Sequence, residues 1–214
     1  METEFITAGV TTTETLKTIY ERRAIRKYKE KPVDNELIEQ ILDAGRMAPS
    51  AINKQPWKFY VLTDEDTIRT FSNEIAKIAA KDFIKDSLKE PIKTIKNILH
   101  SFHRTGIFSG GDPIFHGAPV VIFITGHQND EWAALDIGMC AQNMMLAAKS
   151  MGLDSCPIGL AKYVEQTNVF DRLRVPLTER VHLAVILGYG DEKPEAHERV
   201  KTNALFIYGD EKEK

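Results

Sequence analysis

The stretch Ala48-Pro-Ser-Ala-Ile-Asn-Lys-Gln-Pro-Trp57 joins an amphipathic segment to one that is aromatic and β-branched. A connection between a helix and a strand is a common place for a binding loop. Its small side chains let a flat ring approach, and the amides of Asn53 and Gln55 can both donate and accept hydrogen bonds. By themselves, these residues fit a ligand-binding loop and an ordinary polar connection equally well.

Hydrophobic periodicity on either side of this stretch predicts a succession of helices and strands. Helices are predicted over 14–23, from Asp34 to about Gly45, from Asp64 toward Lys77, over 131–151 and over 164–173, and strands over 57–62, 119–125, 153–160 and 181–188. This order favours an α+β architecture. It does not favour a doubly wound nucleotide-binding fold, because no Gly-rich strand-to-helix turn is present.

The length and composition are those of one globular domain. The chain has 214 residues, of which 43% are hydrophobic and 28% charged, and no linker or repeat divides it. We therefore expect a single domain over 1–214, with an insertion or lid at about 81–116 and a tail at about 200–214. The tail contains the apolar run Ala204–Tyr208, which indicates packing on another surface, such as a partner subunit.

The charge balance and the apolar runs exclude several classes of protein. A formal net charge of −3 argues against a nucleic-acid-binding protein. No signal peptide or membrane-spanning run is visible, so we expect a soluble, cytoplasmic protein. Cys140 and Cys156 form no metal motif and are expected to be reduced, buried thiols. His100 and His103 have no carboxylate companion at metal-ligand spacing, so no metal site is expected.

Three further segments are candidates for ligand binding. Four cations lie in Glu21-Arg-Arg-Ala-Ile-Arg-Lys-Tyr28, where they fit a phosphate site or, more plainly, a solvated helix end. Cys156-Pro-Ile-Gly-Leu160 offers backbone N–H groups to a ligand or is only a tight turn. The glycines of Gly188-Tyr-Gly-Asp-Glu-Lys-Pro194 allow a close backbone approach, and His197 and Arg199 beyond it fit a phosphate site or a solvated tail.

Together these segments resemble the nitroreductase family. The matching stretches occur in the family's order and approximate spacing from about Leu16 to Val200, and they are Arg22–Tyr28, Ala48–Trp57, Pro157–Gly159 and Val185–Tyr189. The resemblance implies a mixed, mostly antiparallel central sheet flanked by helices, in an obligate homodimer. It also implies non-covalently bound FMN, with NADH or NADPH as electron donor and a nitroaromatic, a quinone or a similar small molecule as acceptor.

The resemblance divides the expected cofactor site into four groups. A cluster after the first helix matches positions that hold the flavin phosphate, ribityl chain and pyrimidine edge, and two tail residues match positions that close over the phosphate. A loop matches one that reaches the flavin of the other subunit, and a turn matches one that lies against the ring near N5. These groups are the cluster Arg22, Arg23, Ala24 and Arg26, the loop Pro49, Ser50, Ala51, Asn53 and Gln55, the turn Pro157, Ile158 and Gly159, and the tail residues His197 and Arg199.

No side chain is assigned a catalytic role, because a bound flavin supplies the redox chemistry and the protein supplies position and electrostatics. Arg26 is expected to stabilise the negative charge of reduced flavin near N1 and O2, and the backbone of Gly159 is expected to support N5. Two residues depart from the family pattern. Ala24 stands where many relatives have Ser, and His197 stands where Lys or Arg is often found, so phosphate binding is expected to weaken above pH 7.

The expected function is an NAD(P)H-dependent oxidoreductase with ping-pong kinetics, since both half-reactions share one pocket. Three alternatives stay open. The protein acts on flavin or another dedicated substrate, it binds flavin without significant turnover, or it is an interaction protein without a cofactor. The sequence specifies neither the natural acceptor nor the preference between NADH and NADPH, because Lys81–His116 matches no known substrate-side pattern.

Overall fold

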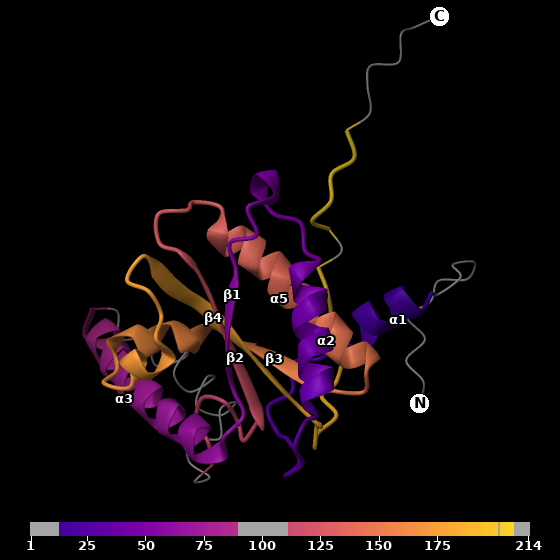
Figure 1. Ribbon diagram of the computed structural model, residues 1–214. Coiled ribbons are helices and arrows are strands. Elements are labelled where there is room, and N and C mark those ends of the chain that lie inside the picture. The colour runs from indigo at the N-terminus through magenta and orange to yellow at the C-terminus, as the bar shows by residue number, and fades with distance from the viewer. Residues whose placement is uncertain (1–12, 90–110, 201, 208–214) are drawn as a thin grey trace, which may run out of the picture.

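The computed structural model describes residues 13–89, 111–200 and 202–207, which form one sheet with helices on both of its faces (Figure 1). In chain order the elements are α1 (Glu14–Glu21), α2 (Asn35–Arg46), the 3₁₀ turn η1 (Ala51–Asn53), β1 (Lys58–Leu62), α3 (Glu65–Lys89), β2 (Val120–His127), α5 (Ala133–Ser150), β3 (Asp154–Ile158), the 3₁₀ segments η3 (Gly159–Gln166) and η4 (Phe170–Leu173), and β4 (Glu179–Gly188). The α+β class predicted from the sequence is confirmed.

The four strands pair in the order β1-β2-β4-β3, and every pair is antiparallel. The mostly antiparallel sheet implied by the family resemblance is thus confirmed. A β-bulge interrupts the central pair, because Ile124 pairs with Leu183 whereas Thr125 pairs with Val181, which leaves His182 as the extra residue. Helices α2 and α5 cover one face of the sheet, and α3 and η3 cover the other (Figure 1).

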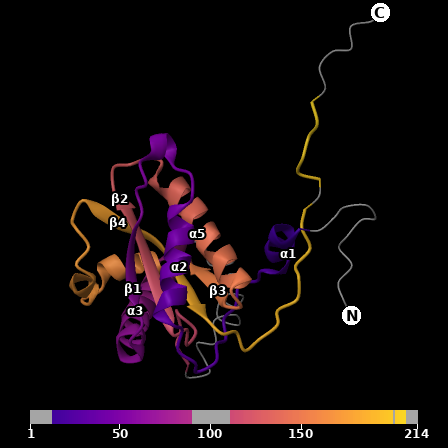
Figure 2. The same cartoon turned by 45° about the vertical axis from the view of Figure 1, so that its right-hand side comes forward.

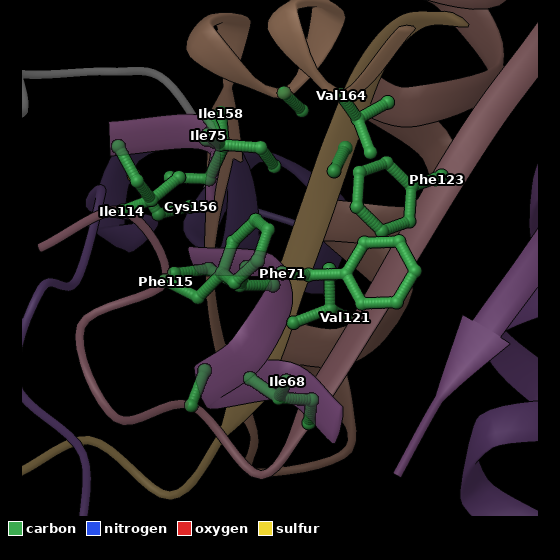
Figure 3. Close-up of a cluster of buried hydrophobic side chains, with 14 of the residues drawn as sticks. Ile68, Phe71, Ile75, Ile114, Phe115, Val121, Phe123, Cys156, Ile158 and Val164 are labelled. Atoms are coloured by element: carbon green, nitrogen blue, oxygen red, sulfur yellow. The ribbon is translucent and has the colours of Figure 1, made fainter. Parts of the chain in front are cut away.

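The central strands are apolar along their length because each face of the sheet has its own hydrophobic cluster. Along β2, Val121 and Phe123 belong to the cluster beneath α3. The alternating residues Val120 and Ile122 belong to the cluster beneath α2 and α5. Figure 3 shows the first cluster, where the rings of Phe115 and Phe123 meet edge to face with centroids 5.8 Å apart.

Gly45 allows α2 and α5 to pack closely. The sequence interpretation placed Gly45 at the end of the helix, and it is the penultimate residue of α2. A Cβ atom at this position would lie 2.7 Å from Cγ of Met144 and 3.1 Å from Sγ of Cys140. The glycine is therefore required by the helix–helix contact and does not stop the helix.

Two predicted helices differ from the observed elements. Helix α3 continues to Lys89, well past the predicted end near Lys77, and the hydroxyl of Tyr163 donates a hydrogen bond to Asp82 (2.5 Å) that ties the extension to η3. The helix predicted over 164–173 is instead the two separate segments η3 and η4. Thr167 separates them, because its hydroxyl donates to the carbonyl of Val164 (2.7 Å) and competes with helical hydrogen bonding.

The expected insertion over 81–116 overlaps the body of the fold at both ends. Residues 81–89 continue α3, and Ile114 and Phe115 are buried in the core. Asp112 fixes this return to the sheet by accepting hydrogen bonds from the hydroxyl of Ser72 and the N–H of Phe115. The rest of the expected insertion, residues 90–110 with His100 and His103, lies outside the described residues.

Helix α1 and the segment after β4 extend away from the sheet (Figure 2). Three apolar residues of this segment, Leu205, Phe206 and Ile207, are exposed. The remainder of the predicted tail, residues 201 and 208–214, lies outside the described part of the chain. Within that described part, no helix combines the length and apolar character needed to cross a membrane.

Candidate functional site

The basic segment after α1 is held against β3 and the exit of β4 by backbone hydrogen bonds. Ala24 and Ser155 form a parallel bridge, and the N–H of Ile25 donates to the carbonyl of Ser155 (3.1 Å). Tyr28 pairs with Gly190 beyond β4, and its hydroxyl donates to the carbonyl of Ile25 (2.9 Å). The structure therefore brings the arginine cluster against β3, the strand that contains Pro157 and Ile158 of the predicted turn.

Arg22 presents a buried donor to this region. Its Nη1 atom is inaccessible to solvent and has no hydrogen-bond partner among the described residues. Burial lowers the pKa of Arg22, the neighbouring Cys156 raises it, and the positive charges of Arg23 and Arg199 lower it further. Nη1 of Arg23, in contrast, donates to the carbonyls of Tyr20 (2.5 Å) and Arg22 (2.9 Å). A buried charged donor without an acceptor is destabilising, so Arg22 marks a place suited to an anion.

The predicted turn after β3 adjoins these cations. Cys156 is buried, and burial raises the pKa of its thiol while the charges of Arg26 and Arg22 oppose that rise. Pro157 and Gly159 are exposed. A Cβ atom on Gly159 would meet no heavy atom of the described residues within 4 Å. The Cβ side of Gly159 is therefore open, three residues beyond Cys156.

The electrostatics of this region include two groups that the sequence did not mark. Oε1 of Glu192 accepts the backbone N–H of Arg26 (2.5 Å), which places a negative charge beside the cations. His116 has a left-handed backbone, with φ of 58°. Burial lowers the pKa of His116, Asp112 raises it, Arg26 lowers it and Glu192 raises it. Nothing in the local sequence of either residue indicated that the chain would return to the arginines here.

The tail residues His197 and Arg199 are exposed in the extended segment after β4. Nη1 of Arg199 donates to the carbonyl of His197 (3.3 Å). The charge of Arg199 also contributes to the lowered pKa of Arg22. The phosphate contact of His197 and Arg199 that the family resemblance implies stays a prediction.

The loop between α2 and β1 has a strained backbone. Ile52, Asn53 and Gln55 have φ values of 47°, 57° and 49°, a region that is rare for residues with side chains and most of all for a β-branched one. Strain of this kind costs roughly 1–3 kcal/mol at each residue and is concentrated at functional sites. The hydroxyl of Ser50 accepts the N–H of Gln55 (2.9 Å), which closes the loop. The loop is exposed, with Ile52 at 90%, and so is available for contact.

This loop does not reach the arginines of its own chain. The N–H of Ala51 bonds to Asp136 in the first turn of α5. The arginine cluster instead adjoins Ser155, beyond the far end of α5. A helix of the 18 residues observed in α5 is about 27 Å long. Figures 1 and 2 show the same separation, with the turn η1 standing above α2 and the segment after α1 below it.

Two expectations about ligand contact are corrected. The glycines after β4 do not leave room for a ligand, because a Cβ atom on Gly188 would lie 2.7 Å from Pro119 and one on Gly190 would lie 2.6 Å from Asp154. They admit protein atoms instead. The predicted turn at Pro157 and Ile158 is strand instead, because both residues belong to β3 and pair with β4, and the side chain of Ile158 is buried in the hydrophobic core.

Ser155 is a candidate contact that the sequence interpretation missed. It is buried, and within the described ranges its Oγ has no hydrogen-bond partner. It lies beside Ala24, the position where many relatives have Ser. The sequence signal was its place directly before the Cys156-Pro157 turn.

The arginine cluster fits the phosphate of FMN. Guanidinium groups bind phosphate oxygens at two points, and the buried donor of Arg22 requires an acceptor of this kind. The open space at Gly159 gives a planar ring a place to lie against backbone. The loop of Ser50 and Asn53 lies away from these residues, at the other end of α5.

Comparisons with known proteins agree with this fit. The family model described as "Nitroreductase family" matches residues 19–189. Nitrobenzene nitroreductase of Ectopseudomonas oleovorans is 34% identical, over 81% of this chain and 85% of the relative. The 4-nitrobenzoate reductase of Pseudomonas putida is 30% identical, over 80% of this chain and 83% of the relative. A nitroreductase structure with bound FMN from Bacteroides fragilis NCTC 9343 is 26% identical with a TM-score of 0.71, covering 92% of this chain and 100% of that one.

Proposed function

This chain belongs to the nitroreductase family, and from that premise we propose that it is an NAD(P)H-dependent FMN oxidoreductase. It takes a hydride from NADH or NADPH and reduces a nitroaromatic, a quinone or a similar conjugated acceptor. The relatives named as reductases of nitrobenzene and 4-nitrobenzoate support the acceptor class. The observation that carries the proposal is the buried, unpartnered Nη1 of Arg22 within a group of cations beside an open turn.

Five basic residues hold the cofactor. Arg22, Arg23 and Arg199 bind the phosphate, with His197 beside them on the tail. Arg26 lies at the pyrimidine end, where its fixed charge stabilises developing negative charge without reorganisation of solvent. When bound, FMN supplies the hydride and electron transfer itself. The chain's contribution is therefore position and charge, and no side chain has to act as nucleophile.

The turn Pro157–Gly159 supports the reacting edge of the ring through its backbone. Gly159 is exposed, and a side chain placed on it would meet no described atom within 4 Å, so the ring can approach the backbone here and be oriented near N5. The donor and the acceptor use the same exposed face in succession, so the proposed kinetics are ping-pong. Ile158 anchors the turn in the core and keeps this backbone in place.

A homodimer completes the site. The loop of Pro49, Ser50, Ala51 and Asn53 lies too far from the arginines of its own chain, so it contacts the flavin bound by a second copy. Large apolar side chains are exposed around the same loop and the start of α5, where a partner would cover them; they are Met47 at 79%, Ile52 at 90%, Trp132 at 48% and Leu135 at 57%. The exposed apolar tail residues Leu205–Ile207 pack on the partner as well.

An absorption spectrum of the purified protein, followed by anaerobic titration with NADH and with NADPH, tests the proposal. We expect the bands of bound FMN and their loss on addition of one or both nucleotides. A colourless protein that stays colourless after FMN is added would contradict it.

A survey of acceptors in the same assay separates the alternatives. Rapid turnover with quinones and nitroaromatics supports the proposal, whereas turnover with flavin or one unusual compound indicates a specialised family member. Bound FMN that neither nucleotide reduces indicates a flavin-binding protein without turnover.

A further inference from the structure

Asp136 is a buried carboxylate inside a mostly apolar helix. It is 1% exposed and lies in the first turn of α5, where the helix dipole stabilises a negative charge. A buried charge is destabilising unless it is well hydrogen-bonded. Its two oxygens lie 3.4 and 3.2 Å from the backbone N of Ala51. The partner of this carboxylate is therefore the flavin-facing loop and not the core around it.

The loop needs an external anchor of this kind. Three residues of the loop have left-handed backbones although none of them is glycine: Ile52, Asn53 and Gln55. Such conformations persist only where surrounding contacts over-determine them. The bond between Gln55 and Ser50 is internal to the loop, so it does not fix the loop relative to the rest of the molecule.

A second contact joins the loop to the same region of the fold. Nζ of Lys54 lies 3.4 Å from Oδ2 of Asp130, and Oδ1 of Asp130 accepts the N–H of Trp132 at the start of α5. Lys54 is a long, half-exposed side chain, and an ion pair of this type contributes little. The hydrogen bond from Ala51 to Asp136 joins a backbone N–H to a buried carboxylate, so it holds the loop more rigidly than the ion pair of Lys54 with Asp130 does.

We propose that Asp136 is a positioning residue for the flavin site of the partner subunit. By accepting the Ala51 N–H, it fixes the strained loop so that Ser50 and Asn53 meet the flavin bound by the arginines of the second copy. The inference rests on the proposed function and extends it to a residue that touches neither flavin nor substrate. It predicts that loss of Asp136 lowers FMN affinity in the opposite subunit and leaves its own arginine cluster intact.

Three variants of the full chain test the contact. Asp136→Leu removes the acceptor and keeps the volume, Asp136→Asn keeps one acceptor oxygen, and Glu131→Gln removes an exposed charge at the start of the same helix region. We expect the FMN dissociation constant, measured by quenching of flavin fluorescence, to rise about tenfold or more in Asp136→Leu. It should rise about threefold or less in Asp136→Asn and stay unchanged in Glu131→Gln. The melting temperature without FMN should change little, since water can solvate the exposed loop.

The outcomes separate the two claims. A wild-type protein that binds no FMN overturns the proposed function and this inference together. Wild-type binding with equal affinity in Asp136→Leu overturns the inference alone, as does an Asp136→Asn variant that binds as poorly as Asp136→Leu. If Asp136→Leu does not fold, Asp136→Ala replaces it, because it also removes the acceptor and places no larger side chain in this buried position.

A heterodimer tests whether Asp136 acts across the interface. One subunit carries Asp136→Leu and the other carries Arg22→Ala with Arg26→Ala, and the mixed dimer is isolated with two different affinity tags. One of its two sites combines intact arginines from the first subunit with an intact loop from the second. We expect about one FMN per heterodimer at near wild-type affinity, although each parent homodimer binds weakly. A heterodimer without a tight site would show that Asp136 acts within its own subunit, which overturns the proposal.

Discussion

Replacing Arg22 with Met should preserve or raise the free energy of unfolding of the FMN-free protein and weaken FMN binding. Met keeps most of the apolar stem and removes the guanidinium. Without FMN, the variant loses a buried donor that has no acceptor in the described chain, and such a donor costs ~1–3 kcal/mol. Its free energy of unfolding should therefore equal that of the wild type or exceed it by up to about 2 kcal/mol.

In the FMN complex the same substitution removes hydrogen bonds between charged groups. Each is worth about 1.5–3 kcal/mol, so the loss of one raises the FMN dissociation constant roughly 10- to 150-fold. The stabilisation that saturating FMN gives the wild type, about 2.7 kcal/mol at 100 times the dissociation constant, should largely disappear at the same FMN concentration.

Urea unfolding with and without FMN, together with fluorescence titration, measures both effects. Arg69→Met is the matched control, because Arg69 is exposed and pairs with Glu65 on the surface of α3. It should change neither quantity by more than a few tenths of a kcal/mol. An Arg22→Met variant that is clearly destabilised without FMN, or that binds FMN as tightly as the wild type, would refute the assignment of this arginine to an anion site.

Three other predictions concern the surroundings of the site. Glu192→Gln keeps an acceptor for the Arg26 N–H and removes a negative charge, so FMN affinity measured by titration should increase a few-fold at low salt and less at high salt; an unchanged affinity at low salt would argue that FMN lies elsewhere. Ala24→Ser should tighten FMN binding by roughly two- to tenfold, the value of one net hydrogen bond, and a weaker complex would contradict this. Burial, with Arg180 as a smaller cause, lowers the pKa of His182 from 6.5 in the folded state. As the pH falls, His182 is therefore protonated in the unfolded chain at a higher pH than in the folded chain, so the free energy of unfolding should fall as the pH drops below about 6.5. His182→Asn should flatten that dependence in urea unfolding between pH 5 and 7, whereas an unaltered slope would exclude His182 as its source.

The elements that the sequence predicted well are those whose periodicity agrees with their burial. The strands β2 and β4 read as continuous apolar runs because both faces of the sheet are covered. Other features have tertiary causes. Gly45 lies at the end of α2 as predicted, but the approach of Met144 from α5 is what requires a glycine there. The break between η3 and η4 depends on a side-chain bond of Thr167, which periodicity does not register.

The site was predictable where one segment carries its own chemistry. The arginine cluster and the Pro157–Gly159 segment were recognisable as motifs, and the structure bridges Ala24 to Ser155 in β3, the strand in which Pro157 and Ile158 also lie. Asp136, Glu192 and Ser155 escaped notice because their roles depend on residues far away in the sequence. Asp136 was visible only as a charged exception in an apolar helix, and its partner Ala51 is 85 residues away.

The central claim is that FMN lies in a site built by two copies of this chain. A crystal structure of the protein with FMN tests it most directly. We predict a homodimer in which the phosphate contacts Arg22 and Arg199 of one subunit while Ser50 and Asn53 of the other subunit touch the same flavin. An FMN molecule enclosed by a single chain, or a dimer whose Ser50–Asn53 loops face away from the partner's arginines, would contradict the account.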